Sequence, residues 1–378
     1  MQKCPGCGIE LMNGCCTNCG FDNSLDYITY PTLESLPVSA RYRSNSQKKA
    51  APFEHDGMLQ CPVCGSTVFS FSLYSRDFVC LKCKSPISQS EFSSLVFQQH
   101  VHVSNSFLYP RAGYIAAGHS HSVVLYRNGK VYATGLNEDG QCNVTHWEDI
   151  IAVDAGGNHS IGLRHDGTVV STGRNRDHQC DIAQWSEIIE ISAGHAHTVG
   201  LTKNGTVLAT GSNSHGQCEV SRWRDIASVS AGDYHTVGLR KDGTVVSTRV
   251  DPHYQHDVSG WKEIIAISAG GGHTVGLKED GTVVTTGFDY FDQCAVSDWK
   301  NISSISAGTF HTLGLREDGT VILAGQTMAS YTDDLASWEN IIAISSGNFH
   351  CLGLCKDGTI VSIGRRAHGK RRVEGLTI

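Results

Sequence analysis

The sequence of 378 residues predicts an all-β fold built from seven copies of one small antiparallel sheet. A histidine recurs with a spacing of 38 residues five times and then 39. An Asp-Gly or Asn-Gly pair follows each histidine at a constant distance, and residues 115–364 lack the apolar periodicity of helices. A fixed period of this length is typical of a repeat architecture. The recurring histidines are His121, His159, His197, His235, His273, His311 and His350.

One repeat, residues 261–287, shows how each copy is expected to fold. Its runs 264–269, 273–277 and 282–286 are rich in Val, Ile and Thr and predict strands of about five residues. Asp280-Gly281 lies between the second and third run and suits the positive φ of a tight hairpin turn. A fourth short strand is expected at 294–296. Each repeat is therefore a small sheet that cannot bury both faces alone.

The ends of the repeat array predict a closed ring. A four-stranded repeat of about 40 residues is the usual blade of a β-propeller, whereas an open stack would need polar capping repeats. The first copy enters at Tyr114 without a preceding Trp, and the last copy has no Trp after it. Residues 372–378 are expected to supply the outer strand that the first blade lacks. We therefore predict a seven-bladed β-propeller over residues 114–378, closed by this tail.

The repeat unit I-x-A-G-x-x-H-[ST]-x-x-L-x-x-[DN]-G-x-V-x-x-x-G resembles those of the RCC1-like seven-bladed propellers. With a Trp before the first strand, it is most similar to the short repeats of the bacterial members. The resemblance covers about residues 112–378 and implies the propeller fold. In that family the ring serves as an exchange factor on a GTPase, as a protein inhibitor of an enzyme, or as a binding platform. The repeat is thus specific for fold and not for function.

Two cysteine clusters before the repeats predict structural zinc. Residues 1–23 and residues 58–88 each contain two C-x-x-C pairs. The two pairs of one segment together present four thiolates, the set that zinc binds tetrahedrally in a zinc ribbon. Cys15 could replace its neighbour, but only Cys16 gives the C-x-x-C spacing. The expected ligands of the two structural Zn²⁺ ions are Cys4, Cys7, Cys16 and Cys19, and then Cys61, Cys64, Cys80 and Cys83. A closed four-thiolate site leaves no position for catalysis.

The segments around these clusters complete the domain prediction. Residues 24–57, rich in Pro, Ser and scattered charge, predict a flexible linker between the two ribbons. Within the second ribbon, 67–75 and 78–79 are expected to form a hairpin. Residues 89–113 are expected to connect the second ribbon to the propeller.

Composition and charge narrow the class of protein. We expect no signal peptide and no membrane span, because the N-terminus lacks the first pattern and no apolar run is long enough for the second. Without a secretion signal, the 15 cysteines are expected to be metal ligands or free thiols, which indicates the reducing cytoplasm. Residues 115–364 carry 16 Lys and Arg against 28 Asp and Glu, a balance of −12. Such a surface repels a phosphate backbone, which disfavours nucleic-acid binding by the ring.

Side chains that follow the period are interpreted as structural. We expect each repeat histidine to hydrogen-bond loop backbone within its blade. The periodic cysteines, Cys142, Cys180, Cys218 and Cys294, are expected to be small hydrophobic residues of the core or its edge. The tryptophans are expected to pack between blades: Trp147, Trp185, Trp223, Trp261, Trp299 and Trp338.

Positions that differ between copies indicate where a partner binds. Loops between the first and second strands, and those after the third, emerge on one face and vary in sequence, whereas the hairpins on the other face are uniform. Aromatic residues gather in the variable loops and are typical of binding hot spots. The expected partner-binding residues are Tyr234, Tyr254, Tyr290, Phe291, Phe310, Tyr331 and Phe349.

Together these features predict a non-catalytic protein–protein interaction platform, with the zinc ribbons as accessory contacts or self-association modules. No nucleophile–base motif, phosphate loop or open metal site indicates an enzyme. One alternative is a regulator of another protein, either a guanine-nucleotide exchange factor or an inhibitor. A second is nucleic-acid binding through the ribbons, for which only Lys3, Arg76, Lys82 and Lys84 supply charge.

Overall fold

The computed structural model describes residues 114–248, 257–326, 335–364 and 372–378, together with five short strands closer to the N-terminus. The chain divides into two units, residues 1–110 and 111–378. In the first unit, β1 (Phe21–Asp22) pairs with β2 (Tyr27–Ile28). A second, three-stranded antiparallel sheet contains β3 (Phe69–Phe71), β4 (Phe78–Cys80) and β5 (Pro86–Ile87).

These strands bear on the expectations for the N-terminal segments. The hairpin expected between Cys64 and Cys80 is confirmed, because β3 and β4 pair with Phe69 opposite Cys80. Strand β2 falls within residues 24–57, so the segment expected as a linker begins with a paired strand. Of the expected zinc ligands, only the backbone of Cys80 belongs to a described strand, and the other seven lie outside the described residues.

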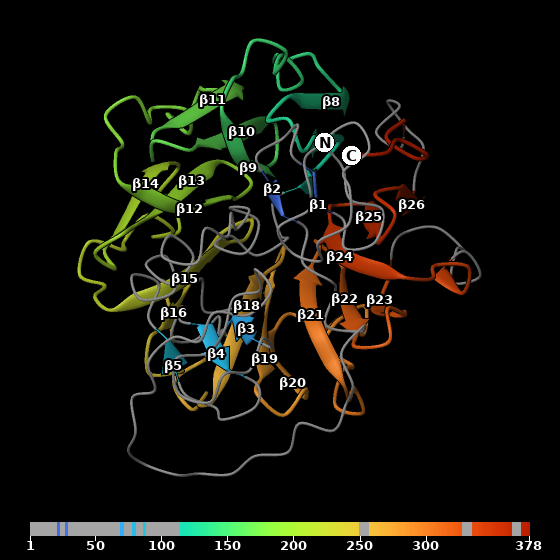
Figure 1. The fold of residues 1–378 in the computed structure, drawn as a ribbon. Helices are drawn as coiled ribbons and strands as arrows, with labels where there is room; N and C mark the ends of the chain where they lie inside the picture. Colours follow the sequence, from blue (N-terminus) through green and yellow to red (C-terminus); the bar gives the residue numbers. More distant parts are fainter. Residues whose placement is uncertain are drawn as a thin grey trace, which may run out of the picture. The chain divides into compact units, whose positions relative to one another are not determined.

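The described residues of the second unit form seven three-stranded antiparallel sheets, which follow one another around a ring (Figure 1). Each sheet is one blade, numbered along the chain. Blades 1 to 4 are β6 (Ile115–Ala117), β7 (His121–Leu125) and β8 (Val131–Gly135); β9 (Ile150–Ala155), β10 (His159–Arg164) and β11 (Val169–Gly173); β12 (Ile188–Ala193), β13 (His197–Thr202) and β14 (Val207–Gly211); and β15 (Ile226–Ala231), β16 (Thr236–Arg240) and β17 (Val245–Ser247). Blades 5 to 7 are β18 (Ile264–Ala269), β19 (His273–Lys278) and β20 (Val283–Gly287); β21 (Ile302–Ala307), β22 (His311–Arg316) and β23 (Val321–Gly325); and β24 (Ile341–Ser346), β25 (His350–Cys355) and β26 (Ile360–Gly364).

Each blade folds as its sequence pattern predicts over the first three strands. In blade 5 the middle strand β19 is buried along almost its whole length, because neighbouring blades cover both of its faces. Gly281 turns the following hairpin with φ of +78°, a conformation that favours glycine. The Asp280 carboxylate accepts a hydrogen bond from Thr282 N at 2.9 Å and fixes the turn.

The expected fourth strand is wrong among the described residues, where every blade has three strands. The segment after β20 instead folds as consecutive turns. Cys294 N donates to the Asp289 carboxylate at 2.7 Å, and Val296 N donates to Cys294 O at 2.8 Å. The Asp289 side chain thus offers the backbone a partner that competes with a strand ladder.

The six tryptophans pack between neighbouring blades, as the sequence predicts. Trp299 lies in one hydrophobic cluster with Leu277 of blade 5 and Ile305 of blade 6. A Cβ on Gly314, in the middle strand of blade 6, would approach the Trp299 ring to 2.6 Å. The same Trp–Gly contact recurs in blades 2 to 7, so each tryptophan ring packs against a glycine of the following blade.

The ring closes where blade 7 meets blade 1. Ile115 and Val124 of blade 1 share a buried cluster with Leu352 of blade 7 and with Val373 of the C-terminal tail. The tail pairs with β26 and its hairpin, since Ile360 N donates to Leu376 O at 2.9 Å. The expectation that the tail adds a strand to the first blade is therefore wrong.

The tail joins the last blade because it continues that blade's repeat. It occupies the seam that a tryptophan-bearing connector occupies elsewhere, with Val373 fully buried there. Val124 correspondingly replaces the glycine of the other middle strands, since no tryptophan lies over it. No helix in the described part of the chain is long and apolar enough to cross a membrane.

Candidate functional site

A ring of polar side chains surrounds the centre of the propeller. The residue five positions before each repeat histidine is a serine in blades 3 to 7, and in blade 7 it is Ser345. Each serine Oγ accepts a hydrogen bond from a backbone N–H of the next blade, as when Ala231 N donates to Ser192 at 3.0 Å. The same bond closes the ring, because Ala117 N donates to Ser345 Oγ at 2.9 Å. This ring ties neighbouring blades together around a central channel.

Blades 1 and 2 complete this ring differently. Blade 1 has Ala116 at the ring position and offers no acceptor to Ala155 N of blade 2. Asp154 accepts from Ala155 N with one carboxylate oxygen and from Ala193 N with the other, both at 2.8 Å. One carboxylate thus does the work of two hydroxyls. Burial raises the pKa of Asp154 to about 6, although these hydrogen bonds oppose the shift.

A second ring of hydrogen bonds joins backbone to backbone. A glycine lies three residues before each repeat histidine, and the N–H of the residue after it donates to the equivalent glycine carbonyl of the next blade, as from His119 N to Gly156 O at 3.1 Å. Asn348 N donates to Gly118 O at 3.4 Å and completes the circle. A Cβ on Gly156 would lie 2.3 Å from Gly194 O, so only glycine allows the blades to approach this closely.

The repeat histidines form a third ring, and their expected loop-backbone partner is wrong. His159 Nε2 bonds Thr198 Oγ1 of the next blade at 2.9 Å, and that hydroxyl donates to Gln179 O at 2.7 Å. Equivalent contacts join the other blades, with Cys351 as the partner of His311 at 3.1 Å and Ser122 as the partner of His350 at 2.8 Å.

These imidazoles are neutral structural groups. Burial lowers the pKa of His159 and His197 to about 3, and that of His121 and His311 to about 4. All four side chains are fully buried. They therefore carry no charge near pH 7 and cannot exchange protons with a ligand at the surface.

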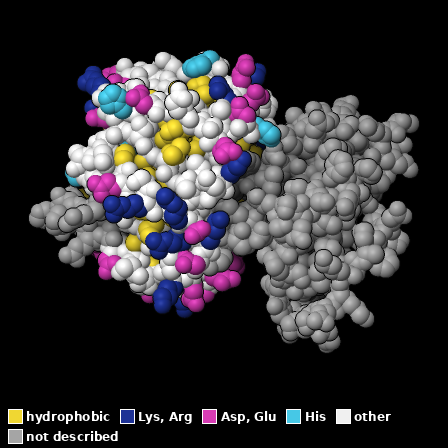
Figure 2. Space-filling model, turned by 90° about the vertical axis from the view of Figure 1, so that its left-hand side faces the viewer, with side chains coloured by type: hydrophobic (Ala, Val, Ile, Leu, Met, Phe, Trp, Pro, Cys, Tyr) yellow, Lys and Arg dark blue, Asp and Glu magenta, His cyan; other side chains and the backbone are white. Residues whose placement is uncertain are grey.

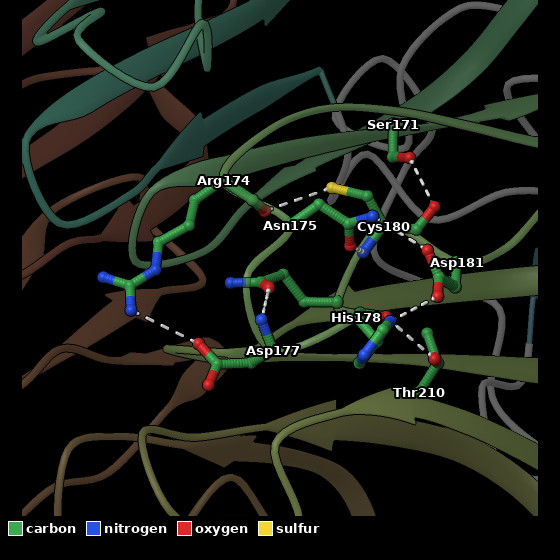
Figure 3. Close-up of polar contacts among 9 residues, drawn as sticks. Ser171, Arg174, Asn175, Asp177, His178, Cys180, Asp181 and Thr210 are labelled. Carbon is green, nitrogen blue, oxygen red and sulfur yellow. Dashed lines mark hydrogen bonds and ion pairs between the residues drawn. The ribbon is translucent and has the colours of Figure 1, made fainter.

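The variable loops lie beyond these rings on one face. Leu136 N of a connector after the third strand donates to Ser120 O of the loop between the first two strands, at 2.8 Å. Figure 3 shows the connector of blade 2, in which Asn175 accepts from Cys180 N at 2.8 Å and donates to Asp181 at 2.8 Å. The Cys180 thiol points at Arg174 O at 3.4 Å. These internal bonds give the connectors a fixed shape.

The periodic cysteines are half-buried in this scaffold, so of the two expected places they take the edge and not the core. Each thiol points at the carbonyl oxygen six residues before it in the connector, and burial raises the pKa of Cys142, Cys218 and Cys294 to about 11. Such thiols stay protonated and unreactive. Among the described residues, no group of three His, Cys, Asp or Glu side chains could hold a metal ion.

An uninterrupted chain of aromatic and imidazole rings crosses the variable-loop face. Neighbouring ring centroids in this chain lie 5.0 to 6.3 Å apart. In order, its members are His215, Tyr234, His195, His119, Phe349, Phe310, Phe291, Tyr290 and Phe288. We call this set the aromatic chain. It draws on blades 1, 3, 4, 5, 6 and 7, so the closed ring brings it together.

The aromatic chain contains every described member of the expected partner surface. Those members are Tyr234, Tyr290, Phe291, Phe310 and Phe349, whereas Tyr254 and Tyr331 lie outside the described residues. Sequence reasoning missed His119, His195, His215 and Phe288 as members. The three histidines occupy repeat positions that vary between copies, which is the signal that identifies the others.

Exposure differs along the aromatic chain. Tyr290 is 80% exposed and stacks on Phe288, with centroids 6.2 Å apart and planes at 21°. Tyr234 is 40% exposed, whereas Phe291 and Phe310 are half-buried. The outer rim seen in Figure 2 instead mixes Lys and Arg with Asp and Glu around small hydrophobic areas. The aromatic chain thus contrasts with the charged rim.

The channel opens on the same face. It encloses a cavity of about 160 Å³, lined mainly by the alanines, serines and glycines of the rings. His119, His195, Asp233, Thr309 and Asn348 also line it, and each follows a ring glycine. Burial raises the pKa of Asp233, while the nearby His195 imidazole opposes this shift. Two members of the aromatic chain, His119 and His195, therefore belong to the channel mouth as well.

Comparisons with known proteins agree with this architecture. The Regulator of chromosome condensation (RCC1) repeat matches residues 114–141, 150–179, 188–217, 226–248 and 264–293. No curated protein matches.

Among solved structures, the chain is similar to the ectodomains of two plant receptor kinases. The CRINKLY WD40 ectodomain of Arabidopsis thaliana ACR4 is 21% identical, covers 69% of this chain and 97% of its own, and has a TM-score of 0.57. The ectodomain of Physcomitrella patens CR4 is 19% identical, covers 66% and 73%, and has a TM-score of 0.56.

A weaker likeness is to Prp20p from Saccharomyces cerevisiae, described with its binding properties to Gsp1p and histones. It is 18% identical, covers 66% of this chain and 71% of its own, and its TM-score of 0.38 is too low to support an argument. At these identities the likenesses establish the fold and nothing finer. The chain carries RCC1 repeats, and its seven three-stranded sheets fit an RCC1-like propeller.

Proposed function

We propose that the chain is a non-catalytic interaction platform whose variable-loop face binds a protein partner. An RCC1-like propeller is a domain commonly used for protein interaction or for nucleotide-exchange activity. The observation that carries the proposal is the aromatic chain. It presents nine rings from six blades on one face, and Tyr290 at its end is 80% exposed. Large aromatic side chains at a surface are typical of binding hot spots.

Charge further defines the partner. Residues 115–364 carry a balance of −12, and the aromatic chain lies within that acidic background. Electrostatic complementarity therefore favours a protein with a basic surface and disfavours a nucleic-acid backbone at the ring.

The zinc ribbons serve, in this proposal, as accessory contacts or self-association modules. The two sets of four cysteines suit two structural Zn²⁺ ions, and the hairpin β3–β4 lies between the two C-x-x-C pairs of the second set. Thiolate sites of this kind need a reducing compartment, so we place the protein in the cytoplasm.

Metal analysis of the purified full chain tests the ribbons. We expect two zinc ions per chain, because each set offers four thiolates at ribbon spacing. The double variant Cys61→Ser/Cys64→Ser should hold one ion, whereas Cys142→Ser, a matched change at a propeller thiol, should hold two. A wild-type chain without zinc would overturn this part of the proposal.

Affinity capture from a lysate of the source cells tests the binding face. The bait is the full chain as wild type, as Tyr290→Ser/Phe291→Ser, or as the control Tyr132→Ser/Leu208→Ser. The control removes apolar side chains that are each 37% exposed on outer strands, away from the variable loops. We expect the first variant to lose the captured protein by tenfold or more, as hot-spot truncation costs about 2 kcal/mol or more.

The outcome also separates the alternatives. If the loop variant captures as much as the wild type, the aromatic chain is not the binding surface. If the captured protein is a GTPase or an enzyme, its exchange rate or turnover with and without the propeller tests the regulator alternative directly.

A further inference from the structure

The channel mouth contains a buried polar group with an unmet hydrogen-bonding requirement. Asn348 is only 5% exposed and lines the central cavity. Its amide nitrogen contacts the His119 ring, but its Oδ1 has no hydrogen-bond partner. A buried acceptor without a donor costs free energy in an isolated protein, so such an atom indicates a missing partner.

A carboxylate lines the same cavity. Asp233 follows the ring glycine of blade 4, as Asn348 does in blade 7, and both side chains border the central space. No Lys or Arg among the described residues forms an ion pair with Asp233. Burial raises the pKa of this carboxyl because it disfavours the charged form, whereas a cation beside the carboxylate would favour that form.

Two imidazoles line the mouth, and each has an aromatic ring beside it. The His119 ring lies 6.2 Å from Phe349, and the His195 ring lies 6.3 Å from Tyr234. The ring centroids of the two imidazoles lie 5.5 Å apart, and both residues line the cavity. The faces of Tyr234 and Phe349 attract a cation, and a planar guanidinium also stacks on aromatic rings.

We propose that the channel mouth receives an arginine side chain of the protein partner, whose guanidinium pairs with Asp233 and donates to Asn348 Oδ1. Arginine fits better than lysine, because its planar fork of donors reaches two acceptors at once and stacks on aromatic rings. The inference rests on the proposed function, names the chemistry of the partner at its centre, and agrees with the balance of −12 on the propeller.

A blocked peptide tests this proposal without knowledge of the partner. The probe is acetyl-Gly-Arg-Gly-amide, titrated into the full chain by isothermal titration calorimetry at low salt. The matched probe carries citrulline, which keeps the shape of arginine but has no charge. We expect the arginine peptide to bind and the citrulline peptide to bind on the order of tenfold more weakly or not at all.

Two variants locate the binding within the protein. Asp233→Asn removes the proposed carboxylate, and Asp292→Asn removes the same charge from an exposed connector on the same face. We expect Asp233→Asn to weaken the arginine peptide by about tenfold or more, and Asp292→Asn to change it by less than about twofold. Asn348→Ala should weaken binding severalfold, and thermal unfolding of each variant checks that it remains folded.

The result can overturn the inference separately from the proposed function. Absence of arginine binding, equal binding of citrulline, or equal effects of the two aspartate variants would each overturn it. If the Tyr290→Ser/Phe291→Ser bait still loses its captured protein in that case, the face binds its partner without an arginine in the channel.

Discussion

Asp154 shows how one residue compensates for a neighbour in the next blade. Its two carboxylate oxygens bond Ala155 N and Ala193 N, whereas each serine of the ring bonds a single N–H. The extra acceptor is needed because Ala116 cannot supply one. The sequence shows that Ala116 and Asp154 depart from the repeat, but their connection depends on the closeness of two blades, which periodicity does not show.

This compensation predicts a rescue between the two positions. Asp154→Ser leaves Ala155 N without an acceptor, and Ala116→Ser with Asp154→Ser restores the regular serine ring. We expect the single variant to have a free energy of unfolding about 1 to 3 kcal/mol lower than the double variant, the cost of one unmet buried donor. Urea unfolding at pH 7 measures it. Equal stabilities of the two variants would show that this ring contributes little.

The repeat histidines show a similar limit of sequence reasoning at the residue scale. Their recurrence correctly predicts a structural role in every blade. Their partners, however, lie in the next blade, as with His159 and Thr198, and both members recur with the same period. A contact within a repeat and a contact between repeats therefore look alike in the sequence.

At the scale of the element, each tryptophan-bearing connector fills a space that the next blade leaves open. Trp299 lies against Gly314 in the middle strand β22, and a Cβ there would come within 2.6 Å of the ring. Blade 1 has no such tryptophan and carries Val124 instead. At the seam, Val124 thus takes the place of the middle-strand glycine, and the C-terminal tail takes the place of the tryptophan-bearing connector. Both replacements are visible in the sequence, and together they mark where the ring closes.

A methyl group added beneath the tryptophan tests this packing. We expect Gly314→Ala to lower the free energy of unfolding by about 1 to 3 kcal/mol, the usual cost of overpacking. Gly260→Ala is the matched control, because nothing lies within 4 Å of its added Cβ, and it should change stability by less than about 0.5 kcal/mol. The midpoint of urea unfolding measures both. A tolerated Gly314→Ala would mean that Trp299 can move aside.

The sequence predicts the number of strands per blade wrongly, because it suggests a fourth strand. The apolar spacing of residues 294–296 resembles a strand. The side chain of Asp289, and of Asn137, Asn175 and Asn213 in other blades, satisfies the backbone N–H at the start of this segment. A local side-chain bond of this kind replaces the ladder, and apolar spacing alone does not reveal it.

At the scale of the whole molecule, the period and the turn dipeptides suffice to predict seven blades and a closed ring. The pairing of the tail is not predictable in this way, because Val373 and Leu376 could pack against either side of the seam. The partner surface is predicted in part: variation between copies selects Tyr290, Phe291 and Phe310, while closure of the ring adds His119 beside Phe349.

We propose that this protein binds a partner through its aromatic chain, and site-specific photo-crosslinking tests this binding most directly. A photoreactive phenylalanine analogue replaces Tyr290 in one full-length chain and Tyr132, on an outer strand, in another. Both are irradiated in a lysate of the source cells. We expect a crosslinked protein from position 290 and none from position 132. Crosslinking from position 132 alone, or equally from both, would contradict the claim.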